Sequence, residues 1–155
     1  MREKMHIIRQ AQTEDVEKIN EFLTKAEVTV EGIEAWLNYF LLMEADEDKN
    51  LIGTIGIEPF GKIGLLRSMV LSRGTVEDIL FLIQQALKLA KDKDMDAIYC
   101  RVHNQHSIQL FQLLGFQEIE EVDIPEVLKE SNVVKSVYTV DKSHFMYISM
   151  NIVDK

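Results

Sequence analysis

Two opposite charges interrupt apolar stretches of this sequence and could take part in acid–base or binding chemistry. Glu58 ends the apolar segment LIGTIGIE, and Arg67 lies inside the apolar segment LLRSMVL. A carboxylate beside an amine can act as a general base, directly or through water, but an acid at a strand end is also commonly just solvated. A buried guanidinium needs a partner, which is either a substrate carboxylate held bidentately or an internal glutamate. Ser68 adds a hydroxyl next to Arg67.

The stretch SRGTVEDIL that follows joins this apolar segment to a long amphipathic one, and strand–loop–helix joints often bind phosphate. Only the pair Arg73 and Gly74 has the residue types of a phosphate-binding loop. Thr75 fits a second interpretation, in which it caps the helix while Glu77 and Asp78 complement the helix dipole. The negative charges of these acids would repel a phosphate. For two unit charges 4 Å apart the repulsion is ~1 kcal/mol in water and ~4 kcal/mol near a protein surface. Both interpretations stay open, and any phosphate binding is expected to be weak.

The elements that must position these residues follow from hydrophobic periodicity. Apolar residues at helical spacing predict helices over 14–26, 29–39, 75–92 and 106–115, with a short helix after Pro125. Apolar or alternating segments predict strands over 6–12, 40–45, 51–58, 65–71, 97–102, 117–122 and 145–152, with turns at 46–50 and 59–64. The order β-α-α-β-β-β-α-β-α-β-β predicts an α/β fold with a mixed sheet, in a single domain over 1–155.

Composition narrows the class of protein. The net charge is −9 and there is no basic stripe, so we expect no nucleic-acid partner. No apolar run is long enough to span a membrane, and the N-terminus lacks the apolar core of a signal peptide. Cys100 is the single cysteine, which excludes an internal disulfide and favours a small apolar core role. These features together predict a cytoplasmic protein.

A metal site is not expected. His103 and His106 are close in sequence, but no third ligand lies at a sensible spacing. The acidic turn at 46–50 is most simply a solvated turn.

The segment NQHSIQLFQLLGF carries a more specific pattern. Asn104, Ser107, Phe111 and the ending Gly115-Phe116 fall in register with a motif of the GNAT family of acetyl-CoA-dependent N-acetyltransferases, which the chain resembles. The resemblance implies a GNAT-like fold with a twisted mixed sheet flanked by helices. It also implies that the 65–71 and 97–102 strands are parallel neighbours that diverge at their C-terminal ends.

The segment GTIGIEPFGKIGLLRSMVL resembles a narrower branch of that family. This branch comprises small amino-acid N-acetyltransferases related to arsenic-resistance and N-acetylglutamate-synthase-like proteins, and the C-terminal segment 124–146 is similar to it as well. The resemblance implies acetyl-CoA as co-substrate and a small-molecule amine as acceptor. It implies Glu58 as general base, Arg67 and Ser68 as substrate-binding residues, and Trp36 in the wall of the acceptor site, where core packing is the alternative.

For the cofactor, the resemblance implies contacts from the backbone of Met69, Val70 and Leu71. The further cofactor-binding residues that it implies are Arg73, Gly74, Thr75, Asn104, Ser107 and Phe111. A place in the N-terminal cap region of the 106–115 helix is the alternative for Asn104, and core packing is the main alternative for Phe111. The sequence departs from the family in two places. The loop after the 65–71 strand looks shortened and lacks its second glycine, and Phe111 replaces the tyrosine often proposed as general acid, for which Tyr138 is the remaining candidate.

Two functions follow from these observations. The first is transfer of an acetyl group from acetyl-CoA to the amine of a small acceptor, with an amino acid as one candidate. The second is a catalytically inactive GNAT-like module that binds a ligand or a protein, because a fold alone does not establish an activity. Homodimerisation through the last strands is a further expectation from the family.

Overall fold

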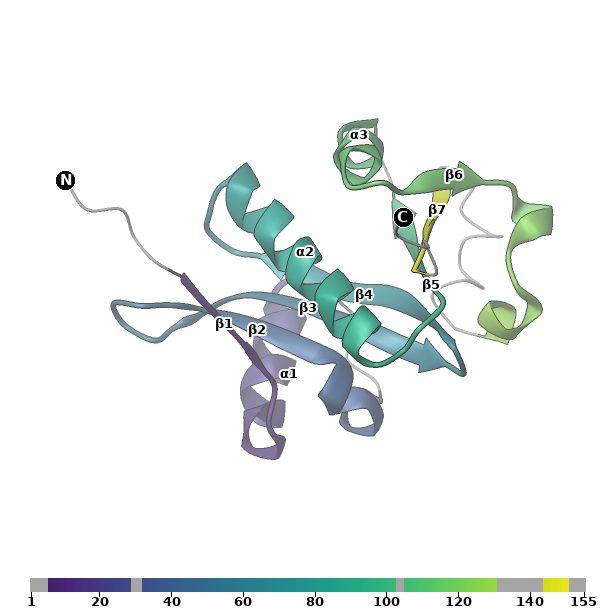
Figure 1. Ribbon diagram of the computed structural model, residues 1–155. Helices are drawn as coiled ribbons and strands as arrows, with labels where there is room; N and C mark the ends of the chain where they lie inside the picture. Colours follow the sequence, from purple (N-terminus) through teal and green to yellow (C-terminus); the bar gives the residue numbers. More distant parts are fainter. Residues whose placement is uncertain (1–5, 29–31, 103–104, 131–143, 151–155) are drawn as a thin grey trace. The chain divides into compact units, whose positions relative to one another are not determined.

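The computed structural model describes residues 6–28, 32–102, 105–130 and 144–150 (Figure 1). The strands are β1 (His6–Gln10), β2 (Phe40–Ala45), β3 (Leu51–Phe60), β4 (Ile63–Leu71), β5 (Ala97–Val102), β6 (Gln117–Ile119) and β7 (His144–Ser149). The helices are α1 (Val16–Lys25), α2 (Val76–Asp92) and α3 (Gln105–Leu113), with short 3₁₀ helices η1 (Thr13–Asp15), η2 (Ile33–Tyr39), η3 (Glu121–Asp123) and η4 (Glu126–Glu130). None of the described helices is both long enough and apolar enough to cross a bilayer.

The described strands follow the order β1-β2-β3-β4-β5-β7-β6. β1 with β2, β2 with β3, β5 with β7 and β6 with β7 pair antiparallel, whereas β4 and β5 pair parallel. The predicted α/β class with a mixed sheet is therefore confirmed. The chain divides into two compact units, Met1–Glu58 with Arg67–Leu89, and Pro59–Leu66 with Ala90–Lys155. The single domain expected from the sequence stays a prediction.

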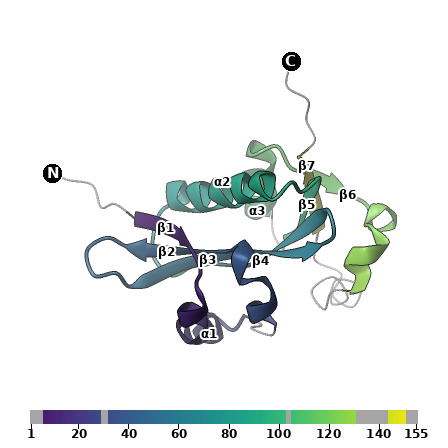
Figure 2. The same ribbon diagram turned by 60° about the horizontal axis from the view of Figure 1, so that its bottom comes forward.

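The first unit places its helices on both faces of its strands. Figure 2 shows α1 on one face of β1 to β4 and the N-terminal part of α2 on the other. On the α1 face, a buried cluster joins α1, η2 and the strands; its members are Ala11, Ile19, Leu23, Ile33, Trp36, Phe40 and Leu42. Burying such a face supplies most of the helix stability, because short isolated helices are marginal in water.

Gly56 in β3 lies directly under the aromatic part of this cluster. The rings of Trp36 and Phe40 lie 5.5 Å apart between centroids and are tilted by 45°. A Cβ at Gly56 would come within 2.5 Å of the Trp36 ring and 2.6 Å of the Phe40 ring. The absence of a side chain at Gly56 is therefore what allows Trp36 to lie against the strand.

The second unit has its own pairing and core. Ile63, Gly64 and Leu65 of β4 pair with Ala97, Ile98 and Tyr99 of β5, so the predicted parallel pairing is confirmed and the ladder ends at Leu65. The expected divergence of the two strands beyond that point stays a prediction. The buried cluster of this unit consists of Leu65, Ile124, Leu128 and Phe145, which come from β4, the residue after η3, η4 and β7.

Several boundaries differ from those that the sequence predicts, and three of the differences change the connections or the helix type. The turn expected over 59–64 shrinks to Gly61 and Lys62, because β3 extends to Phe60 and β4 begins at Ile63. The strand expected over 117–122 ends at Ile119, and a 3₁₀ turn follows. The helix expected over 29–39 is 3₁₀ in its described part, with a kink at Trp36 (φ −138°, ψ 36°). The contacts of the Trp36 ring with Phe40 and with β3 at Gly56 override the α-helical pattern of the sequence.

A buried ion network fastens the start of the chain to β2. The Arg9 guanidinium donates to both carboxylate oxygens of Asp15 at 2.8 Å and to Glu44 at 3.0 Å. Asp15 and Glu44 are buried, at 5% and 8% exposure. The hydrogen bond from Arg9 lowers the pKa of Asp15. Burial alone would raise the pKa of Glu44, but the hydrogen bond from Arg9 and the charges of Arg9 and Lys18 lower it overall.

Replacing Arg9 should destabilise the fold in a pH-dependent way. Both carboxylates have lowered folded pKa values, so their pairing stabilises the protein above pH ~4 and this contribution is lost as the pH falls through the folded values. Arg9→Gln leaves both acids buried without their main partner. We expect a loss of about 2–3 kcal/mol at pH 7, below the fully buried range because Arg9 is itself 34% exposed.

The measurement is urea denaturation at pH 7 and at pH 4. The loss should be smaller at pH 4, because the orphaned carboxylates of the variant can then be protonated. Lys129→Gln, which removes the cation of a more exposed ion pair, should change stability little at either pH. An equal loss for Arg9→Gln at both pH values would contradict the assignment.

Candidate active site

Glu58 and Arg67 meet across the β3–β4 hairpin. The Arg67 Nη1 donates to Glu58 Oε1 at 2.8 Å, and the side chains are 9% and 24% exposed. Of the two partners that the sequence allowed for Arg67, the structure provides the internal glutamate. Glu58 is accordingly an ion-paired, partly buried carboxylate rather than a freely solvated one.

Arg67 keeps hydrogen-bonding capacity after this contact. Its guanidinium carbon lies 5.7 Å from the centroid of the Trp36 ring, within the range of a cation–π interaction. A guanidinium has five N–H donors, and only the bond to Glu58 engages them within the described part of the chain. An internal ion pair and a bidentate contact with a ligand carboxylate are therefore compatible at this one residue.

Ser68, the next residue of β4, has a left-handed backbone with φ of 58°. This conformation interrupts the extended strand in the way that a β-bulge residue does. Thr54, which is fully buried in β3, donates its hydroxyl to the Ser68 carbonyl oxygen at 2.7 Å. Thr54 was not among the predicted site residues, and its only signal in the sequence is a hydroxyl residue inside the apolar run LIGTIGIE.

Beyond this irregularity, β4 carries three residues expected to contact a cofactor. Met69 is 39% exposed, whereas Val70 is partly buried and packs against the core cluster of the first unit. Gly53 of β3 approaches them closely, since a Cβ there would lie 2.9 Å from Leu71 Cδ1 and 3.3 Å from the Val70 carbonyl oxygen. The backbone of 69–71 is thus supported from β3, and its cofactor contacts stay a prediction.

The loop after β4 ends in a capping box, which the cap interpretation of the sequence anticipated. The Asp78 backbone N–H donates to Thr75 Oγ1 at 3.3 Å, and the Thr75 N–H donates to Asp78 Oδ2 at 2.8 Å. The Asp78 N–H also donates to the Thr75 carbonyl oxygen at 3.0 Å, so the reciprocal pair adds to a turn at the helix N-terminus, where backbone donors lack helical partners. The carboxylate of Asp78 therefore occupies one of the N–H groups that a phosphate would use.

The rest of the loop closes over the Asp78 carboxylate and leaves several backbone N–H groups unengaged. Gly74 has φ of 146°, and a Cβ there would lie 2.8 Å from Asp78 Oδ2, so the loop closes tightly over that carboxylate. The Oδ1 of Asp78 lies 3.2 Å from His6 Nδ1. In the described chain, the backbone N–H groups of residues 73, 74, 76 and 77 have no hydrogen-bond partner. These groups are the donors available to an anion, and the predicted pyrophosphate contact stays a prediction.

The remaining predicted residues are distributed elsewhere. Asn104 and Tyr138 lie outside the described residues. In the second unit, Ser107 is half-buried on α3, while Phe111 is 3% exposed and packs edge-on against Phe116 with centroids 5.0 Å apart. This environment is that of a core aromatic residue.

Among the described residues, no three His, Cys, Asp or Glu side chains gather in a way that could hold a metal ion. Burial raises the pKa of the Cys100 thiol, so the thiolate that would act as a nucleophile is disfavoured.

The Glu58–Arg67 pair should contribute measurably to stability. Arg67→Met leaves a partly buried carboxylate without its cation, and we expect a loss of about 2–3 kcal/mol in the free energy of unfolding. Combining it with Glu58→Gln should cost less than the sum of the two single changes, because residues in direct contact couple by about 0.5–3 kcal/mol. Urea denaturation of the four proteins measures this coupling.

The exposed pair of Arg73 and Asp48 is the matched control. These side chains are 50% and 45% exposed and 3.3 Å apart, so Arg73→Met should leave stability nearly unchanged. Strict additivity of the Arg67 and Glu58 changes would show that the contact does not stabilise the fold.

The capping box generates a second prediction. Thr75→Ala removes the oxygen that accepts the Asp78 N–H, and we expect a loss of about 1 kcal/mol from the unfolding free energy. Asp78→Ala should cost a similar amount, and the double variant little more than either alone. Glu77→Ala, which removes a first-turn acid outside the box, should cost less, about 0.3–1 kcal/mol. A larger loss for Glu77→Ala than for Thr75→Ala would argue against the box.

Solved structures of acetyltransferases share this fold. An N-acetylglutamate synthase from Neisseria gonorrhoeae, complexed with coenzyme A and N-acetyl-glutamate, matches 97% of the chain with a TM-score of 0.73 at 20% identity. The chain spans 36% of the length of that synthase. A GNAT-family acetyltransferase from Staphylococcus aureus Mu50 matches 95% of the chain and all of its own length, with a TM-score of 0.73 at 22% identity. The chain therefore has the GNAT acetyltransferase fold.

Sequence comparison identifies a relative. No protein-family model matches the chain. The uncharacterized protein YwlB from Bacillus subtilis strain 168 is 32% identical over 127 residues, which cover 81% of this chain and 84% of YwlB. The chain, whose fold is that of the GNAT acetyltransferases, therefore belongs to the same family as YwlB.

Proposed function

We propose that this protein transfers an acetyl group from acetyl-CoA to the amine of a small acceptor that carries a carboxylate, such as an amino acid. The observation that carries the proposal is Arg67. It is held by Glu58 and Trp36 on a GNAT fold, yet most of its donors are unengaged within the described chain. A guanidinium with spare donors suits bidentate recognition of a carboxylate.

The two charged residues then have complementary roles. Arg67 binds the acceptor carboxylate, which places the neighbouring amine close to Glu58. Glu58 takes a proton from the acceptor ammonium, directly or through one water, so that the amine becomes nucleophilic. Its contact with Arg67 uses one carboxylate oxygen, Oε1, and leaves Oε2 for this step. Holding the acceptor in this geometry lowers the entropic part of the barrier.

Acetyl-CoA would supply an acetyl group activated as a thioester. The backbone of 69–71 would hold its pantetheine arm, and the N–H groups of residues 73, 74, 76 and 77 would hold its pyrophosphate. Asn104, Ser107 and Phe111 are further proposed contacts. Tyr138 is the proposed proton donor to the thiolate, although a thiol with a pKa near 8.5 also leaves without assistance. The crystallised synthase with this fold binds coenzyme A and N-acetyl-glutamate, which supports both the cofactor and the acceptor class.

The capping box favours a second candidate function. The Asp78 carboxylate already accepts the hydrogen bond of the Thr75 N–H. The resemblance to the family implies that a cofactor phosphate binds at this N–H group. If this carboxylate excludes the cofactor, the chain is a ligand-binding or protein-interaction module with a GNAT fold. The expected homodimer fits either function.

Cofactor binding distinguishes the two candidates. We expect coenzyme A to raise the midpoint of thermal unfolding, since a ligand at 100 times its Kd stabilises by about 2.7 kcal/mol. Asp78→Asn removes a negative charge but keeps an acceptor oxygen for the capping box. It should tighten coenzyme A binding by roughly tenfold at low salt, with a smaller gain at high salt. Lys88→Gln removes the charge of an exposed residue on the same helix and should not tighten coenzyme A binding.

Thiol release in the presence of acetyl-CoA tests the reaction itself. Amino acids should be better acceptors than the corresponding amino-acid amides, which lack the carboxylate. Arg67→Lys should raise the KM for the amino acids and leave that for the amides unchanged, because lysine cannot make the bidentate contact. No stabilisation by coenzyme A, with either the wild type or Asp78→Asn, would refute acetyl transfer and leave the module as the function.

A further inference from the structure

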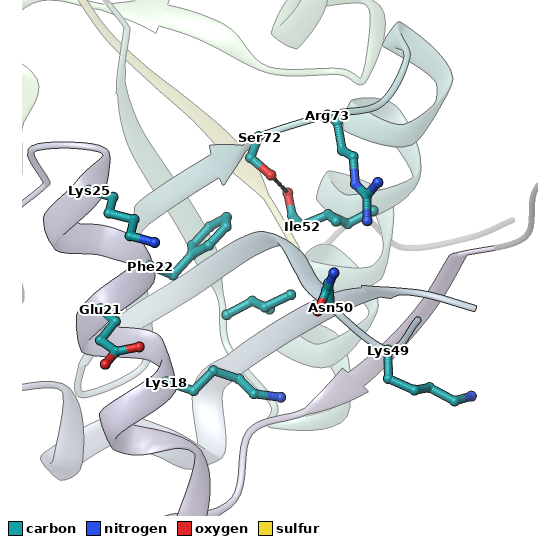
Figure 3. A pocket seen from close by; sticks show the side chains of 10 residues that line it. Lys18, Glu21, Phe22, Lys25, Lys49, Asn50, Ile52, Ser72 and Arg73 are labelled. Carbon is teal, nitrogen blue, oxygen red and sulfur yellow. Dashed lines mark hydrogen bonds between the residues drawn. The ribbon is translucent and has the colours of Figure 1, made fainter. Parts of the chain in front are cut away.

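A pocket of about 540 Å³ lies in the first unit, apart from Glu58, Arg67 and Trp36. α1, the β2–β3 turn, the start of β3 and the loop after β4 form it (Figure 3). Its lining residues are Lys18, Glu21, Phe22, Lys25, Lys49, Asn50, Leu51, Ile52, Ser72 and Arg73. The pocket includes α1, whereas α2 covers the opposite face of these strands (Figure 2). The volume falls within the range of small-molecule sites.

The charge of the lining is opposite to that of the whole chain. Four cationic side chains and one acid line the pocket, although the chain has a net charge of −9. Bringing like charges together costs free energy unless something compensates them, and most basic residues in so acidic a chain would be expected beside acids. A concentrated positive field in a hollow attracts anions in particular.

The cations of the pocket have weak partners or none. Lys18 lies 3.4 Å from Glu44, but that carboxylate is already bound by Arg9 at 3.0 Å. Lys25 has no hydrogen-bond or ion-pair partner among the described residues.

The other two cations of the pocket, Lys49 and Arg73, pair with acids of the β2–β3 turn. The N–O distances of the two pairs are 3.6 Å and 3.3 Å, and the side chains are largely exposed. Exposed ion pairs contribute little to the stability of the fold. A ligand with several negative charges can therefore recruit all four cations at small cost.

We propose that this pocket binds a phosphate-bearing small molecule. Its cations would neutralise the phosphate, and Asn50 and Ser72 add polar groups to the lining. Phe22 and Ile52 give the pocket an apolar part that suits the non-phosphate portion of such a ligand. The phosphate belongs either to coenzyme A or to a separate phosphorylated metabolite. The site does not depend on acetyl transfer and would persist if that function failed.

Isothermal calorimetry with pyrophosphate at low salt tests the site. Lys25→Glu reverses the charge of the exposed lysine that has no partner to lose, so the fold should be retained, which thermal unfolding checks. We expect pyrophosphate binding to weaken by about tenfold or more. Lys88→Glu makes the same charge change on α2, outside the pocket, and should weaken binding less than threefold, by a long-range effect only.

This comparison tests the α1 side of the pocket, because Lys25 lies on α1, whereas Ser72 and Arg73 of the lining belong to the loop before α2. Absence of binding to the wild-type protein at millimolar pyrophosphate would overturn the proposal. Equal weakening by Lys25→Glu and Lys88→Glu would overturn it as well, since it would show a response to net charge alone.

A competition experiment identifies the source of the phosphate. Pyrophosphate is titrated into protein that has been incubated with excess coenzyme A. If its Lys25-dependent binding disappears, the pocket takes the phosphates of coenzyme A. If that binding persists, a separate phosphate-bearing ligand occupies the pocket. Both results support a phosphate site, whereas a residual signal that Lys25→Glu does not affect would contradict it.

Discussion

The left-handed backbone at Ser68 is the constraint on which the candidate site depends. A strand alternates its side chains between two faces, and a residue with φ of 58° breaks that alternation. Leu65 and Leu66 before the break are buried, whereas Met69 after it is exposed. For a residue other than glycine this conformation costs ~1–2 kcal/mol, and the buried hydrogen bond from Thr54 offsets a cost of that order. Arg67 stands immediately before the break, so its direction and the exposure of Met69 are set together.

Charge in this molecule serves two different purposes, depending on burial. Where acids are buried, as Asp15 and Glu44 are, arginine satisfies them with short hydrogen bonds that fasten elements together. Where charges are exposed, as between Arg73 and Asp48, the pairs are long and easily exchanged. The buried ion pairs stabilise the fold, whereas the exposed pairs leave their side chains available to bind a ligand.

Periodicity in the sequence was sufficient for most elements, because helices and strands with one apolar face repeat every 3.6 or 2 residues. β2 and β5 have the predicted boundaries, and the mixed sheet follows from the element order. The kink at Trp36 could not be predicted from the sequence, because it arises from the packing of the Trp36 ring over Gly56. The αL residue at Ser68 was equally hidden, because glycine usually marks that conformation and serine does not.

The site shows the same division. Thr75 before an apolar helix with acids in its first turn indicated a cap, whereas the reciprocal hydrogen bonds between Thr75 and Asp78 were not predicted. The partner of Arg67 depends on how β3 and β4 face each other, which the residue types leave open. Lys18 and Lys25 lie seven positions apart on α1, a spacing that places them on one helix face and was the available signal for the pocket.

The division of the chain into interleaved units has a consequence for biosynthesis. The first unit needs only residues up to Leu89, whereas the second combines Pro59–Leu66 with a segment that begins at Ala90. During vectorial synthesis from the N-terminus, the tip of the β3–β4 hairpin is therefore made well before β5, its parallel partner. Until β5 emerges from the ribosome, the apolar edge of Ile63 and Leu65 is an unpaired strand, which is the kind of surface that chaperones bind and that aggregates form from.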